Sequence, residues 1–242
     1  MGYTIEKYTL PSNGKIAGIP KEVSLRNMTT AEEKMLIGSG EDVFDDIISQ
    51  CVTDPKDFNI GDLVLIDKNF LYVKLRILSY GSEYKFQYRC PRCGEISEYS
   101  IDLDSLPVDL LPDDFSEPFA ELELPVSKEK VTLRIPRIKE YADNRMKVRR
   151  YNKKFPSAKG DQGWIYGMMS FIDTIDGKPV DAKLQKWVEE LHARDAAYIR
   201  HHIGKVDAGI DTTIVEDCPK CQEEIDIQIP TGASFFRATF DD

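Results

Sequence analysis

The chain has 242 residues, of which 41% are hydrophobic and 31% charged, the balance of a globular protein long enough to bury a core without covalent help. The formal net charge of −10 opposes nucleic-acid binding through the bulk field of the protein. No run of about 18 apolar residues is present, which excludes a membrane-spanning helix. The first residues lack the apolar core of a secretion signal, so we expect a protein of the reducing cytoplasm, where cysteines are metal ligands or free thiols more often than disulfides.

Residues 1–24 show little periodicity, and the stretch LPSNGKIAGIPKE within them holds two Pro and two Gly. We interpret this segment as an N-terminal arm. It would be either a partly loose tail or a segment that orders against a neighbouring subunit.

Residues 25–82 are predicted to be helical. Thr29 followed by Glu32 forms a capping-box pattern ahead of a first helix, and Gly38 is its expected stop. The stretch EDVFDDIISQCV predicts a second helix, and FLYVKLRILSYG a third.

Cys51 lies in the second of these helices, on an apolar stripe with Val43, Ile47 and Ile48. We interpret it as a buried small apolar side chain, and not as a metal ligand or a nucleophile.

The hydrophobic period then changes to two, which is typical of strands. EYKFQYRC and GEISEYSIDL flank a CPRC turn, and this arrangement predicts a β-hairpin with Cys90 and Cys93 at its tip. TTIVEDC and EIDIQIP flank a second turn in the same way, at Cys218 and Cys221. The two hairpins are assigned to residues 83–104 and 210–232.

An inserted region, residues 105–209, separates the two hairpins. FAELELPVSKEKVTLRI predicts a further hairpin, and several helices follow it. The first of these helices is strongly charged, so it presents either a solvated face or a docking surface for an acidic partner. Its basic residues are Arg145, Lys147, Arg149, Arg150, Lys153 and Lys154.

The last segment, residues 233–242, is an aromatic tail with little polar cover. Phe235, Phe236 and Phe240 would either anchor the chain in a neighbouring subunit or fold back onto its own core.

Cys90, Cys93, Cys218 and Cys221 are predicted to bind one structural Zn²⁺ per chain. A CxxC at a hairpin tip aims two thiolates at one point, and four sulfurs about 2.3 Å from the ion satisfy its tetrahedral preference. About 125 residues separate the two pairs, so the inserted region must fold with its ends close together. A closed four-thiolate site has no open coordination position and would be structural rather than catalytic.

Three further interpretations of the cysteines stay open. A thioredoxin-like redox pair needs a helix after the CxxC, whereas strands are expected after both turns. The cysteines would otherwise be thiols without a metal, or the ligands of an Fe–S cluster.

No catalytic constellation is visible. His201 and His202 are adjacent and would point to different faces of a helix, and His192 with Asp195 is an ordinary i,i+3 pair. The Gly-rich stretch IGSGED lacks the Lys of a phosphate-binding loop, and neither a GxSxG nor an HExxH motif occurs. These observations favour a binding or building-block protein over an enzyme.

The order LPSNGKI, IPKEVSLRNMTTAEEKML, VFDDIISQCV, GDLVLIDKNFLYVKLRILSYGSEYKFQYRCPRCGE and, late in the chain, CPKC and IPTGASFF resembles the T4-type bacteriophage baseplate protein family. The resemblance spans most of the chain and is most specific in residues 10–95 and at the final strand. It implies a non-enzymatic virion protein of a contractile tail, a component or assembly factor of the baseplate hub. Such a protein would be assembled in host cytoplasm and would bind other baseplate and hub subunits.

We therefore expect an α+β fold, rich in helices, with a split four-cysteine zinc ribbon made by two distant hairpins and an inserted α/β region. The expected function is that of a structural or assembly component of the baseplate hub. The alternative is a nucleic-acid-associated zinc-ribbon protein that binds through Arg145, Lys147, Arg149 and Arg150. A redox or hydrolytic enzyme would require a perturbed thiol or carboxylate that the sequence does not locate. Neither a membrane nor nucleic acid is an expected partner, and the sequence does not predict an oligomeric state.

Overall fold

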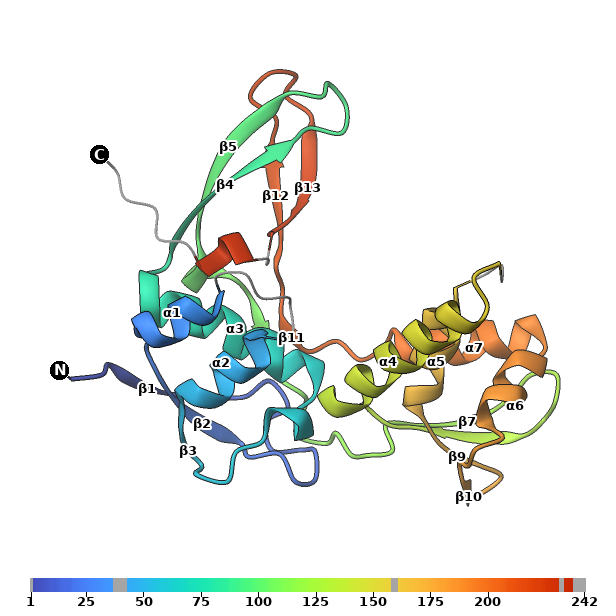
Figure 1. The fold of residues 1–242 in the computed structure, drawn as a ribbon. Coiled ribbons are helices and arrows are strands. Elements are labelled where there is room, and N and C mark those ends of the chain that lie inside the picture. The colour runs from blue at the N-terminus through green and yellow to red at the C-terminus, as the bar shows by residue number, and fades with distance from the viewer. Residues whose placement is uncertain (1, 37–42, 158–160, 231–232, 237–242) are drawn as a thin grey trace.

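The computed structural model describes residues 2–36, 43–157, 161–230 and 233–236. Figure 1 shows three parts: a body that contains the N-terminal sheet and helices, a pair of hairpins that projects from the body, and an inserted unit beside it. The mixture of helices and small separate sheets confirms the expected α+β class.

The body is built on an antiparallel sheet in the order β1-β2-β3. A hydrophobic core shared with the hairpins joins this sheet to three helices. The longest of these three helices, α3, is capped at its C-terminus by Gly81, whose φ of 86° suits glycine. The elements are β1 (Ile5–Thr9), β2 (Glu22–Arg26), β3 (Val52–Asp54), α1 (Thr30–Leu36), α2 (Val43–Cys51), the 3-10 helix Ile60–Asp62 and α3 (Leu65–Tyr80).

The prediction of an N-terminal arm is wrong, because residues 5–26 form a hairpin that belongs to the body. Strand β1 pairs with β2 from Ile5 opposite Arg26 to Thr9 opposite Glu22. The loop between them buries Leu10 and Ile16, and the Ser12 N–H donates to Asp67 of α3 at 2.8 Å. The Pro and Gly residues that obscure the periodicity therefore build a compact loop rather than a loose tail.

The three predicted helices of the body are confirmed. Thr29 and Glu32 form the expected capping interaction, with the Thr29 N–H donating to the Glu32 carboxylate at 2.7 Å. Gly38 lies outside the described residues. Cys51 is fully buried in the core, which confirms its interpretation as an apolar side chain, and burial raises the pKa of its thiol to about 12.

The two predicted cysteine hairpins are present and rise from the body side by side (Figure 1). Their inward faces are apolar: Tyr84, Phe86 and Tyr99 are buried on the first, and Ile225 and Ile227 on the second. The first consists of β4 (Glu83–Arg89) and β5 (Ile96–Asp102), and the second of β12 (Thr213–Asp217) and β13 (Glu224–Gln228).

The inserted unit has a second core of its own, formed by a four-stranded sheet in the order β10-β9-β8-β7 and by helices that pack on it. The predicted hairpin is the β7–β8 pair, and the charged helix is α4. The elements are β7 (Ala120–Glu123), β8 (Lys130–Leu133), α4 (Ile138–Lys154), α5 (Gln162–Phe171), β9 (Ile172–Ile175), β10 (Lys178–Pro179), α6 (Leu184–Glu190) and α7 (Ala193–Ile203).

A short strand pair brings the two ends of the inserted unit together. Strand β6 (Val108–Asp109), which follows the 3-10 helix Leu103–Ser105, is antiparallel to β11 (Gly209–Ile210). The Asp211 N–H adds a hydrogen bond to the Pro107 carbonyl at 3.0 Å. The insert therefore begins and ends at the same place on the body, which allows the two hairpins to lie side by side.

The aromatic C-terminal segment folds back on the body. Phe235 and Phe236, in the 3-10 helix Ala233–Phe236, are buried, and Phe235 stacks on Tyr72 with ring centroids 5.2 Å apart. The guanidinium of Arg76 donates to the Phe235 carbonyl at 2.7 Å. Phe240 lies outside the described residues.

Candidate metal centre

The two cysteine turns have the same local structure. In the first, the Cys90 N–H donates to the Glu95 carbonyl at 2.8 Å, and the Gly94 N–H to the Cys90 carbonyl at 3.0 Å. In the second, Cys218 is bonded to Glu223 and Gln222 to Cys218 in the same way, both at 2.9 Å. The residue after each second cysteine has a positive φ, 74° at Gly94 and 57° at Gln222. CPRCGE and CPKCQE therefore build two copies of one knuckle.

Each knuckle turns backbone N–H groups toward its first sulfur. The N–H groups of Cys93 and then Arg92 hold the pKa of Cys90 below its ordinary value. The equivalent groups of Cys221 and then Lys220 lower the pKa of Cys218 to about 7. Because hydrogen bonds to sulfur favour the thiolate, both first cysteines are prepared for the form that binds a metal.

The second cysteines behave differently. The Glu95 N–H lowers the pKa of Cys93, but burial and the neighbouring thiols outweigh it and raise that pKa to about 11. Burial, followed by the neighbouring thiols, also raises the pKa of Cys221. Four thiols so close together share their protons, and a divalent cation would displace these protons.

The four sulfurs converge although the two pairs lie far apart in sequence. The Sγ atoms of Cys90 and Cys221 are 3.8 Å apart, and those of Cys93 and Cys218 are 3.7 Å apart. All four Sγ atoms lie within 4.8 Å of one another. A tetrahedron with metal–sulfur bonds of about 2.3 Å has edges of about 3.8 Å, so the cluster has the size of a mononuclear four-thiolate site.

Reciprocal ion pairs link the two knuckles beside the sulfurs. Arg92 of the first knuckle pairs with Glu223 of the second, and Lys220 of the second pairs with Glu95 of the first at 2.6 Å. The sulfur contacts are reciprocal too, since the first cysteine of each turn lies against the second cysteine of the other. The site is therefore pseudo-symmetric, with equivalent contributions from both hairpins.

A family model matches the chain over residues 2–237, and its family is described as T4 bacteriophage base plate protein. The chain belongs to this baseplate protein family. Comparison with curated proteins and with solved structures finds no match. The membership confirms the resemblance seen in the sequence and assigns the protein a structural role in a phage baseplate, among other phage structural proteins in the virion tail.

The geometry of the four cysteines in this baseplate protein fits a site for a single metal ion better than it fits the other interpretations. Strands β5 and β13 follow the two turns, so neither CxxC precedes a helix as in a thioredoxin-like site. The shortest sulfur separations far exceed a disulfide bond of about 2.05 Å. A cluster of several irons would place its thiolates on different irons and hold the sulfurs further apart.

The histidines of the baseplate protein have local roles. His192 caps α7, accepting the Arg194 N–H at 3.1 Å, and His202 lies against Tyr198 and bonds to its carbonyl. The rings of His201 and His202 are 86° apart, as expected for adjacent helical residues. Asp195 is buried, and its carboxylate accepts the N–H groups of Val126 and Ser127 in the β7–β8 turn.

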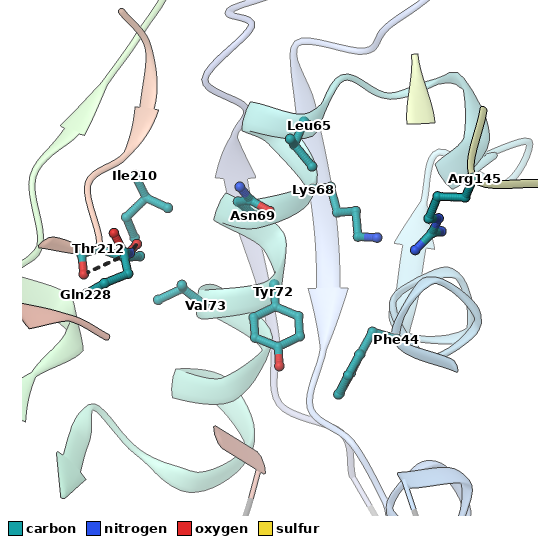
Figure 2. A pocket seen from close by; sticks show the side chains of 10 residues that line it. All are labelled: Phe44, Leu65, Lys68, Asn69, Tyr72, Val73, Arg145, Ile210, Thr212 and Gln228. Atoms are coloured by element: carbon teal, nitrogen blue, oxygen red, sulfur yellow. Dashed lines mark hydrogen bonds between the residues drawn. The ribbon is translucent and has the colours of Figure 1, made fainter. Parts of the chain in front are cut away.

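A pocket of about 360 Å³ opens where the hairpins, the body and α4 meet. Figure 2 shows Tyr72 and Val73 of α3 on one wall, Thr212 and Gln228 at the base of the second hairpin, and Arg145 of α4 opposite. Its described lining mixes apolar side chains with the cations Lys68 and Arg145. Among the described residues, no helix is both long and apolar enough to cross a bilayer.

Proposed function

We propose that this protein is a structural component of the hub of a contractile-tail baseplate, and that Cys90, Cys93, Cys218 and Cys221 hold one structural Zn²⁺. The convergence of four sulfurs from two distant hairpins supports the metal. Membership of the baseplate family supports the structural role.

The metal would supply four coordinate bonds in a closed tetrahedral site, with no position left for a substrate. The residues of the chain do the rest. The two knuckles orient the sulfurs, and the paired charges of Arg92 with Glu223 and of Lys220 with Glu95 hold the knuckles face to face. The result is a projecting element of fixed shape, suited to protein–protein contacts.

The site also fixes the geometry of the inserted unit. The β6–β11 pair closes the insert at its base, and the cysteine cluster joins the same two chain segments at the far tip of the hairpins. Metal binding therefore contributes directly to folding, because the unfolded chain does not keep the two knuckles together.

Metal analysis of protein purified without chelator tests the zinc proposal. We expect about one zinc per chain, loss of the zinc in Cys93→Ser, and retention of it in the matched control Cys51→Ser, since Cys51 lies in the core away from the cluster. A metal-free wild-type chain whose stability is unaffected by chelator contradicts the proposal.

The hub role is tested in a phage that lacks this gene. We expect tails to stop before a complete baseplate, and the supplied protein to co-purify with hub subunits. Truncation of residues 1–22 is unsuitable for mapping the contact, because it removes β1 and the buried Leu10. Normal tails without the protein would refute the structural role while leaving the zinc proposal standing.

A further inference from the structure

A groove of about 480 Å³ lies between the start of α3 and the helix pair α4–α5. The apolar part of its lining includes Leu65 from α3 and Tyr141 and Val148 from α4. Leu65 is 40% exposed, which is high for a large apolar side chain. Gly163 and Gly167 of α5 also line the groove, and a Cβ at Gly167 would meet nothing within 4 Å. The groove is thus open to an incoming apolar side chain.

Cationic side chains line the groove, namely Lys68 of α3 and Arg145 and Arg149 of α4. Helix α4 carries seven basic and two acidic side chains. Arg149, Arg150, Lys153 and Lys154 are exposed, and they form two like-charged i,i+4 pairs that repel one another. A partner that brings negative charge would relieve this repulsion.

The outward face of the second hairpin is acidic and carries one exposed apolar side chain, so it complements the groove in charge and polarity. Val215 of β12 is 58% exposed and lies opposite Asp226 of β13. Asp217 lies opposite Glu224, so two like charges face one another directly, a pairing that destabilises a hairpin. The face therefore offers one apolar side chain among carboxylates, which matches a groove lined by apolar and cationic side chains.

We propose that the outward face of the β12–β13 hairpin of one copy docks into the α4–α5 groove of a second copy. Val215 enters the apolar part of the groove, while Glu224 and Asp226 meet Arg149 and Arg150. Hairpin and groove belong to different parts of the molecule, and in Figure 1 the hairpins rise away from the inserted unit. The contact is head to tail: the copy that inserts its hairpin keeps a free groove, and the copy whose groove is filled keeps a free hairpin. Assembly therefore continues into a ring or a filament. This inference stands independently of the hub assignment.

Sedimentation velocity of the zinc-loaded protein, at concentrations up to about 100 µM, tests the contact. We expect association in about 0.05 M salt that weakens in about 0.5 M salt, because exposed charge pairs are screened. Arg149→Glu with Arg150→Glu, or Glu224→Lys with Asp226→Lys, should each weaken association about thirtyfold or more. The control, Lys183→Glu with Lys186→Glu at the start of α6, makes the same charge change on another exposed surface and should leave association unchanged.

Mixing the two charge-reversed proteins is the decisive step. Alone, each would place like charges across the contact, whereas in the mixture every groove meets a hairpin of opposite charge. Association should therefore return in the mixture and in neither protein alone. Circular dichroism and zinc content identify any variant that fails to fold.

Three results overturn the inference. One is a wild-type chain that stays monomeric at low salt. Another is association that neither double reversal weakens, or that mixing does not restore. The third is a monomer whose α4 cations instead retard nucleic acid in a low-salt gel shift, which would favour a nucleic-acid-binding role for this helix.

Discussion

Replacement of Phe235 by alanine should unfold the body at markedly lower denaturant, because this side chain is part of the core rather than of a free tail. Phe235 is 0% exposed. Its ring stacks on Tyr72 at 5.2 Å between centroids and meets Tyr84 edge-on at 4.9 Å. The hydrogen bond from Arg76 goes to the backbone carbonyl of Phe235, so the substitution leaves it in place.

The expected loss follows from these contacts. A buried Phe→Ala change typically costs about 3–5 kcal/mol through lost transfer free energy and the cavity left behind. Each aromatic pair adds about 0.5–1.5 kcal/mol beyond its buried area. We therefore expect about 4 kcal/mol, which corresponds to a fall in Tm of about 8–16 °C for a chain of this size.

Urea unfolding followed by circular dichroism measures this loss, with Phe155→Ala as the matched control. Phe155 caps the end of α4 and is 45% exposed, so its removal should change the free energy of unfolding by less than about 1 kcal/mol. If Phe235→Ala costs no more than Phe155→Ala, the aromatic segment is not a core element. Anchoring of this segment in a neighbouring subunit would then be favoured.

Two further substitutions test buried polar groups of α3. Arg76→Met should lower the free energy of unfolding in urea by about 3 kcal/mol or more. The buried guanidinium donates to the carbonyls of Phe235, Gly81 and Glu83, and the substitution would leave these carbonyls without their donor. A loss below about 1 kcal/mol contradicts this. Burial raises the pKa of Asp67 from 3.8 to about 6, so the folded chain binds the proton more tightly and stability falls as pH rises through this window. The difference in unfolding free energy between Asp67→Asn and wild type should therefore shift by about 3 kcal/mol in favour of the variant between about pH 3 and about pH 7. A difference that does not change with pH would show that Asp67 does not titrate in this way.

The parts of the fold that the sequence predicts best are those with strong local patterns. Cys51 is identified as a core residue because its helix has a continuous apolar stripe, and the stripe alone determines which face is buried. The four ligand candidates are identified because CxxC at a hairpin tip restricts where both sulfurs point. The reciprocal pairing of Arg92 with Glu223 and of Lys220 with Glu95 appears only in the structure.

Other features depend on contacts between distant residues and leave little local signal. Strands β6 and β11 have two residues each, too few to show a period, yet they close the insert. The hairpin of residues 5–26 escapes prediction because its turn residues hide the alternation, and because Leu10 and Ile16 reveal their burial only against the body. For Phe235, composition alone does not distinguish a buried ring from an exposed anchor, and its packing against Tyr72 and Tyr84 decides the matter.

X-ray absorption at the zinc edge of the purified protein tests the central claim most directly, namely that two remote cysteine pairs share one ion. The account predicts zinc with a single shell of four sulfur neighbours at about 2.3 Å. A shell that contains nitrogen or oxygen ligands, or protein free of zinc whose four thiols react freely in the native state, would contradict it.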